Sequence, residues 1–77
     1  MNGRLAGSLL YLNSLKDNQP NIFQLLTRKE LADFAGISTE STVKLLKTFE
    51  KEGLINIQEK DILFLDIDSI QGVYKRG

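Results

Sequence analysis

A helical pattern interrupted by a glycine is the feature that most restricts how this chain can fold. The segment over residues 30–46, ELADFAGISTESTVKLL, begins and ends like an amphipathic helix, but Gly36 lies in its middle and three hydroxyl side chains follow within five residues. Thr27 and Glu30 have the spacing of a capping box, which predicts a helix that starts directly after Thr27. Gly36 can end that helix because it adopts a positive φ angle without strain, and Ser38 is the next natural N-cap. The sequence therefore predicts two helices joined by a tight turn, the arrangement of a helix-turn-helix.

Each of these two predicted helices has an apolar face. The second helix runs from residue 39 to about residue 52, and Gly53 ends it. Helical spacing predicts the two buried faces as Leu31, Phe34 and Ala35 in the first helix and Thr42, Leu45, Leu46 and Phe49 in the second. The Thr42 hydroxyl group needs a partner on such a face, for which the carbonyl group one turn earlier is suited.

The flanking segments complete a small known architecture. Leucines at helical spacing predict a first helix over residues 2–15, followed by a loop over residues 16–21. Residues 22–26 fit either a short strand or a buried approach to the next helix. After Gly53 the pattern predicts a β-hairpin in which EKD joins the strands LINIQ and ILFLDI. The predicted fold class is α+β, mainly α: a winged helix-turn-helix with a three-helix core and a C-terminal β-hairpin wing.

Three smaller expectations concern the packing of these elements. In the second strand, alternation places Leu63, Leu65 and Ile67 on one face and Ile62 and Phe64 on the other. Asp68 is the expected N-cap of a short terminal helix over SIQGVY. In the first helix, the small residues Gly3 and Gly7 are expected to allow close packing of a neighbouring element.

Composition excludes several classes of function. The 77 residues give room for one small domain, and 42% hydrophobic with 26% charged residues is typical of a globular chain. The sequence has no cysteine and no histidine, so the usual zinc sites and most catalytic triads cannot be built, and DIDSIQG does not match the calcium-loop pattern. We therefore expect neither an enzyme nor a metal site. No apolar run approaches the roughly 20 residues that span a bilayer, and no signal-peptide core is present, so we expect a cytoplasmic protein with no membrane partner.

The second helix of a winged helix is the element that enters the major groove when such a domain binds DNA. In this chain it carries three lysines on one outer stripe and three glutamates that cancel their charge: Lys44, Lys47, Lys51, Glu40, Glu50 and Glu52. The formal net charge of the chain is zero, so the charge pattern also fits a solvated surface. The hydroxyl groups of Ser38, Thr39 and Ser41 suit phosphate contact beside the first amides of the helix, with simple helix capping as the alternative.

The residues quoted so far resemble a known family. LTRKELADFAGISTESTVKLLKTFEKEGLI, over residues 26–55, is similar without a gap to the DNA-binding segment of the Crp/Fnr family of bacterial transcription regulators. GRLAGSLLYL resembles the start of the first helix in the family's DNA-binding domain, and INIQEKDILFLD resembles its wing. The resemblance covers nearly the whole chain and implies sequence-specific binding of double-stranded DNA.

The resemblance also implies a domain organisation. Residues 1–77 are expected to form a single winged-helix domain of a larger regulator, in which an N-terminal sensor domain with a long dimerisation helix comes first. We expect no cofactor in this piece, because a cyclic nucleotide or other ligand would belong to the missing sensor domain. The expected partners are double-stranded DNA and a second copy of the regulator, with RNA polymerase as a further partner that the resemblance allows.

Positions that contact DNA in the family can be matched one by one to this chain. In a recognition helix over about residues 39–52, the expected base contacts are Thr39, Glu40 and Lys44, and the Glu40 carboxylate is suited to accept a hydrogen bond from a cytosine amino group. Thr39 and Lys44 stand where better-known members carry arginine, so the preferred operator should differ. Matches to phosphate-contacting positions are Thr27, Arg28 and Ser38. From their own chemistry and place, Ser41, Lys47 and the wing-tip Lys60 are added to the phosphate contacts, with a solvated turn lysine as the alternative for Lys60.

A winged helix that binds another protein, and not DNA, is the alternative function. The zero net charge fits this alternative modestly. In that case neutralising Lys44 and Lys47 should matter little, whereas changing Ile62 or Phe64, if exposed, should abolish the complex.

Overall fold

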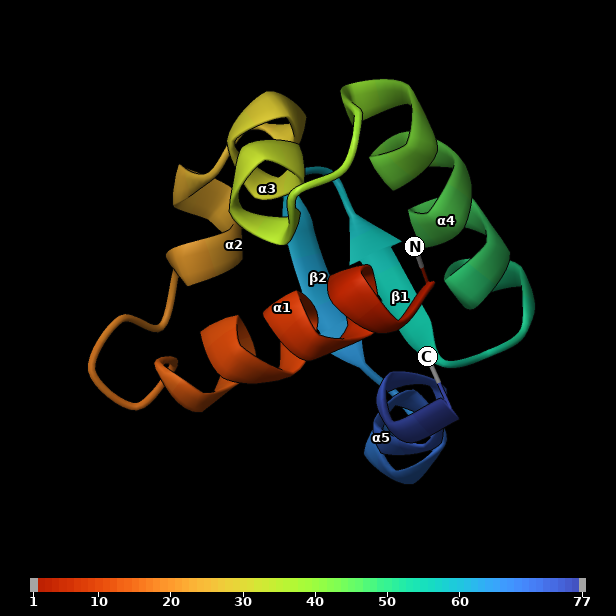
Figure 1. Cartoon of the computed structure of the whole chain (residues 1–77). Helices are drawn as coiled ribbons and strands as arrows, with labels where there is room; N and C mark the ends of the chain where they lie inside the picture. Colours follow the sequence, from red (N-terminus) through yellow and green to blue (C-terminus); the bar gives the residue numbers. More distant parts are fainter. Residues whose placement is uncertain (1, 77) are drawn as a thin grey trace.

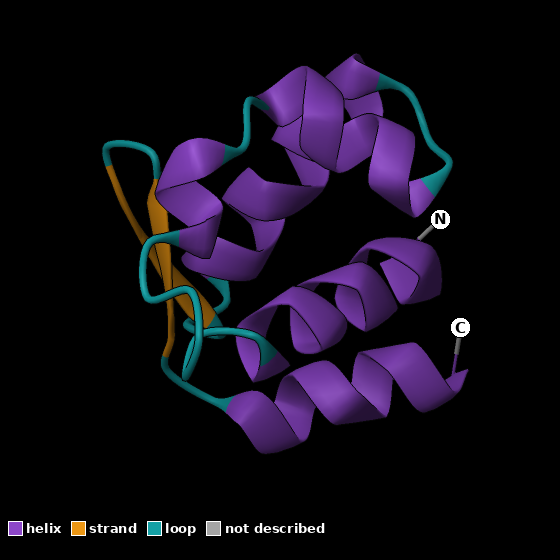
Figure 2. Cartoon of the chain, turned by 90° about the vertical axis from the view of Figure 1, so that its left-hand side faces the viewer, coloured by secondary structure: helices purple, strands orange, loops and turns teal. Residues whose placement is uncertain are grey.

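The computed structural model describes residues 2–76, which form a helical body with a β-hairpin at one edge (Figure 1; Figure 2). In chain order the elements are α1 (Asn2–Ser14), α2 (Ile22–Leu25), α3 (Arg28–Ala35), α4 (Thr39–Lys51), β1 (Ile55–Gln58), β2 (Asp61–Phe64) and α5 (Ile67–Arg76). The helices α1, α3 and α4 pack against one another, and the two antiparallel strands follow α4. The predicted winged helix-turn-helix is confirmed. Within the described residues, no helix combines the length and the apolar character needed to cross a membrane.

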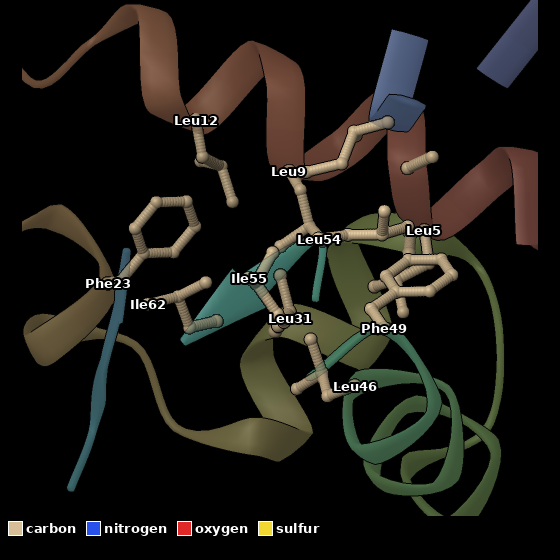
Figure 3. Close-up of a cluster of buried hydrophobic side chains, with 13 residues drawn as sticks. Leu5, Leu9, Leu12, Phe23, Leu31, Leu46, Phe49, Leu54, Ile55 and Ile62 are labelled. Atoms are coloured by element: carbon tan, nitrogen blue, oxygen red, sulfur yellow. The ribbon is translucent and has the colours of Figure 1, made fainter. Parts of the chain in front are cut away.

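One apolar cluster holds the helices and the hairpin together (Figure 3). The predicted stripe of α1 is part of it, and Phe23 of the single-turn helix α2 enters it with 1% of its side chain exposed. Residues 22–25 therefore approach the next helix as a helical turn and not as a strand. The largest fully buried apolar side chains are Leu5, Leu9, Phe23, Leu31, Leu46, Phe49, Ile55, Ile62 and Ile70.

The turn between α3 and α4 is built from backbone hydrogen bonds around Gly36. This residue has a φ of 74°, and its amide donates to the carbonyl oxygen of Asp33 at 3.2 Å. The next amide, of Ile37, donates to the carbonyl oxygen of Ala32 at 3.1 Å, which completes a Schellman motif. Arg4 Nη1 of α1 also donates to the Gly36 carbonyl oxygen, at 3.2 Å. The predicted end of α3 at Gly36 is confirmed, and the turn is tied to α1.

Thr42 is a fully buried polar residue of α4. It has 0% exposure, and its Oγ1 donates to the Ser38 carbonyl oxygen at 3.0 Å. This is the bond to the carbonyl group one turn earlier that the sequence predicted. Because the hydroxyl group is satisfied within its own helix, the methyl group of Thr42 can pack in the core at little cost.

The prediction that Phe34 lies on the buried face of α3 is wrong. Its side chain is 53% exposed, whereas Leu31, Ala32 and Ala35 are buried. The Phe34 ring stacks on that of Tyr11 in α1, with the ring centroids 5.8 Å apart and the planes 15° apart. Phe34 therefore joins α3 to α1 at the surface and not in the core.

The wing has a two-residue turn. Gln58 pairs with Asp61, so Asp61 belongs to β2 and the turn consists of Glu59 and Lys60. The predicted connection over residues 59–61 was one residue too long. Glu59 has a backbone φ angle of 58°. This is the left-handed region, which residues other than glycine, asparagine and aspartate rarely adopt. The turn therefore holds Glu59 in a conformation that its residue type does not favour.

Two charged side chains attach the wing to the helices. Glu50 Oε2 of α4 accepts a hydrogen bond from the Ile57 amide of β1 at 2.9 Å. Lys16 Nζ donates to the Ile62 carbonyl oxygen of β2 at 3.1 Å and lies 5.1 Å from the centroid of the Phe23 ring. Each strand is thus held by a charged side chain from outside the hairpin, Glu50 from α4 and Lys16 from the turn after α1.

The second strand ends earlier than its sequence pattern suggests. The amides of Leu65 and Asp66 both donate to the Leu54 carbonyl oxygen, at 2.9 and 3.1 Å, and these bonds turn the chain out of the sheet after Phe64. Leu65 and Ile67 therefore do not continue a strand face, contrary to the prediction, and both are exposed.

The N-cap of α5 is Asp66 and not Asp68. Asp66 Oδ1 accepts from the Ser69 amide at 3.1 Å, and its Oδ2 accepts from the Ser69 hydroxyl group at 2.6 Å. Asp68 lies within the first turn of the helix. The helix packs along α1, where a Cβ atom on Gly7 would lie 2.6 Å from the Tyr74 ring. The expected close packing at Gly7 is thereby confirmed.

The Asp66 cap should make α5 sensitive to acid. The hydrogen bonds from the Ser69 hydroxyl group and amide lower the pKa of Asp66. A carboxyl group whose pKa is lowered by folding stabilises the protein above its unfolded pKa of about 4, and this contribution is lost as the pH falls through the lowered value. Asp66→Asn keeps a capping oxygen but cannot titrate. In urea unfolding followed by circular dichroism, the wild-type protein should be the more stable at pH 7, and the difference should close below about pH 4. A difference that stays constant with pH would contradict this prediction.

Candidate nucleic-acid interface

The first turn of α4 presents two of the predicted hydroxyl groups in a bonded pair. Ser38 is the exposed N-cap, and its Oγ accepts from the Ser41 amide at 3.0 Å. The Ser38 hydroxyl group donates to Ser41 Oγ at 2.9 Å, so the Ser41 proton remains available for an external acceptor. Thr39 is exposed beside them. Helix capping and contact with an anionic ligand are therefore compatible here.

The outer stripe of α4 is more basic than its formal charge suggests. Lys44 Nζ lies 3.2 Å from Glu40 Oε1, in a pair whose side chains are 75% and 79% exposed. Lys47 and Lys51 are also exposed, and within residues 2–76 they make no ion pair. Because the Glu50 carboxylate accepts a hydrogen bond from the wing, it is held toward β1. The stripe thus carries the paired acid Glu40 beside several lysines, and the acids Glu50 and Glu52 are also exposed residues near the end of the helix.

The start of α3 carries two further predicted contacts. Thr27 Oγ1 accepts from the Glu30 amide at 3.0 Å, and the Thr27 amide donates to Glu30 Oε1 at 2.9 Å, which confirms the capping box. Arg28 follows and is half-buried. Burial lowers the pKa of Arg28, but a guanidinium stays charged at neutral pH. This helix start therefore combines a positive charge with the first amides of a helix, both of which favour an anion.

A shallow hollow separates the start of α3 from the turn of the wing. It is lined by Leu26, Thr27, Arg28, Glu59 and Lys60. The structure therefore brings together three of the predicted phosphate contacts, Thr27, Arg28 and Lys60, although they come from segments far apart in the sequence. A second hollow around the same turn is lined by Gln24, Gln58, Glu59, Lys60 and Asp61.

The predicted residues thus form two groups. One group lies at the start of α3 and the wing turn, and the other lies on α4, from Ser38 to Lys47. Sequence reasoning missed Glu59, which lines both hollows beside Lys60. The sequence signal that was available is that Glu59 directly precedes Lys60 in the turn segment EKD. It also missed Gln24, because the conformation of its segment was open.

Comparison with known families agrees with this geometry. A family model described as a Crp-like helix-turn-helix domain matches residues 3–72, from α1 into α5. All residues predicted above to contact bases or phosphates lie within the matched range. No curated protein sequence matches the chain.

Proposed function

Because this chain belongs to the Crp-like helix-turn-helix domain family, we propose that it binds double-stranded DNA with sequence preference and places α4 in the major groove. The family is one of DNA-binding domains and not of enzymes. The observation that carries the proposal is the outer face of α4, where Lys47 and Lys51, exposed and without ion partners among residues 2–76, follow a helix start that retains a free hydroxyl donor. Hydroxyl groups and lysine ammonium groups are among the groups that fix a protein on the phosphate backbone.

In this proposal the two groups of residues have different tasks. Thr39, Glu40 and Lys44 contact base edges in the groove and set the sequence preference. The phosphate contacts fix the register of the domain on the duplex, and they are Thr27, Arg28, Ser38, Ser41, Lys47 and Lys60. The wing turn and the start of α3 would contact the DNA phosphate backbone at the same place, because they line one hollow.

The proposal extends to the regulator of which this domain would be part. Two copies would occupy half-sites about one helical turn of DNA apart, as two-fold symmetric helix-turn-helix proteins do. Transcription would be controlled through RNA polymerase, and a bacterial regulator of this kind would act in the cytoplasm.

Fluorescence anisotropy of labelled duplexes at increasing salt tests the proposal. Three cations are proposed to contact phosphates: Arg28, Lys47 and Lys60. The logarithm of the association constant should therefore fall with the logarithm of the salt concentration with a slope of about −3. Binding that is independent of salt would contradict the proposal. If the folded chain binds no duplex at low salt, even after two copies are joined by a linker, the domain is a protein-interaction module instead.

Glu59 should weaken DNA binding in the wild-type chain. Glu59 lines the same hollow as Arg28 and Lys60, so its negative charge would repel a phosphate group bound there. Glu59→Asn removes the charge, and asparagine tolerates the positive φ at this position better than glutamate. We expect duplex binding about two- to fivefold tighter at low salt, the size of one exposed charge interaction. Glu52→Gln changes the net charge equally at the end of α4 and serves as the control. Equal gains in both variants would show a general charge effect and not one of the wing turn.

A further inference from the structure

Val43 is an apolar side chain of α4 that the core does not use. The inner face of the helix consists of the buried Thr42, Leu46 and Phe49. Leu45 is half-buried and packs against the core cluster. Val43 is half-buried as well but, among the described residues, it is not one of those that pack against this cluster. The exposed part of the Val43 side chain therefore lies on the side of α4 that carries the outer stripe of lysines.

Helix geometry places Val43 between the residues proposed to contact bases. At 100° per residue, Thr39 and Lys44 lie about 140° apart around the axis of α4, and Val43 lies in the arc between them, about 40° from Thr39. Along the axis Val43 is about 6 Å from Thr39 and about 1.5 Å from Lys44. A base-pair edge that contacts both Thr39 and Lys44 therefore lies on the side of α4 that carries Val43.

The major groove offers one apolar group to such a side chain, the C5 methyl group of thymine. An isopropyl group gains free energy when it covers this methyl group, but it can only desolvate the polar edges of the other bases. We propose that Val43 contacts the C5 methyl group of a thymine and thereby selects DNA sites with thymine at this step. This inference rests on the proposed function, because it needs α4 in the major groove.

Replacement of thymine by deoxyuridine tests the inference, since deoxyuridine lacks only the methyl group. Preferred duplexes are first selected from a randomised library with the 77-residue chain, and each thymine is then replaced in turn. At one thymine, the wild-type chain should lose about fourfold in affinity, which is the effect of one methyl group. Val43→Ala should bind the thymine and deoxyuridine duplexes equally. Val73→Ala, a matched change of a half-buried valine in α5, should keep the wild-type preference.

Two results would overturn the role of Val43 while leaving DNA binding intact. The first is a wild-type chain that selects a site but tolerates deoxyuridine at every thymine. The second is a Val43→Ala variant, folded by circular dichroism, that keeps the full preference for the methyl group. A wild-type chain that selects no duplex at all would overturn the proposed function and this inference together.

Discussion

Phe49→Ala should remove most of the folding stability of this domain. Phe49 is 2% exposed and points into the same cluster as Leu5 (Figure 3). Its carbonyl oxygen accepts from the Leu54 amide at 2.9 Å, in a Schellman motif around Gly53 with a φ of 79°, so the side chain is anchored where α4 turns into the wing. Truncating a buried phenylalanine to alanine costs about 3–5 kcal/mol. A domain of 77 residues has only roughly 4–12 kcal/mol of unfolding free energy.

Phe34→Ala is the matched control for this change. It removes the same atoms from the neighbouring helix α3, but the Phe34 side chain is 53% exposed and its ring stacks on Tyr11. We expect a loss of about 1 kcal/mol or less, the value of one surface aromatic pair. Urea unfolding followed by circular dichroism compares the two variants, and Phe49→Ala should be largely unfolded already at low urea. Equal losses in the two variants would show that the core is not centred on Phe49.

Local signals in the sequence were sufficient for the helix-turn-helix itself. The capping box of Thr27 and Glu30, the glycine at the end of α3 and the Ser38 cap each act within a few residues, so their hydrogen bonds could be predicted before any tertiary contact was known. The hydroxyl bond of Thr42 follows the same rule, because its partner lies one turn earlier. These signals also located α4, the proposed recognition helix.

Features decided by tertiary packing could not be predicted in this way. The eight-residue helix α3 is too short for its pattern to choose between a face with Phe34 and a face with Ala32, since both fit helical spacing. The end of β2 depends on two bonds to the Leu54 carbonyl oxygen, and these decide that Asp66 and not Asp68 caps α5. The positive φ of Glu59 contradicts its residue preference and follows from the strand register.

The candidate interface shows the same division between local and tertiary information. Sequence reasoning identified the lysines of α4, but the formal neutrality of the helix hid how they are presented. In the structure the Glu50 carboxylate is bonded to β1 and Glu40 is paired with Lys44, so Lys47 and Lys51 are the lysines of α4 without an ion pair among residues 2–76. The hollow that joins Arg28 to Lys60 spans 32 positions of the chain, from 28 to 60, and no local pattern could reveal it.

Lys44→Ala should change which DNA sequences this domain prefers, and not only how tightly it binds. In the free chain Lys44 pairs with Glu40 at 3.2 Å, but both side chains are more than 70% exposed, so the pair is worth only about 0.3–0.5 kcal/mol. A guanine edge that offers two acceptors in the groove can therefore displace Glu40 from Lys44. Loss of this contact should weaken binding to the preferred duplex about tenfold, while binding to other duplexes changes less. Anisotropy against a panel of duplexes with single base-pair changes measures both effects.

A double-mutant cycle separates base contact from the loss of a charge. Lys44→Ala also leaves the Glu40 carboxylate unpaired near the duplex, so adding Glu40→Gln to this variant should recover part of the affinity for duplexes that lack a cytosine at the proposed Glu40 contact, but none of the discrimination that Lys44 supplies. Lys29→Ala is the control, because Lys29 forms an equally spaced exposed pair with Asp33 on α3, with 3.4 Å between the charged atoms. It should leave the ranking of the duplexes unchanged. If Lys44→Ala also keeps the wild-type ranking, the lysine contacts only the backbone, and the sequence preference must come from the other residues of the arc between Thr39 and Lys44.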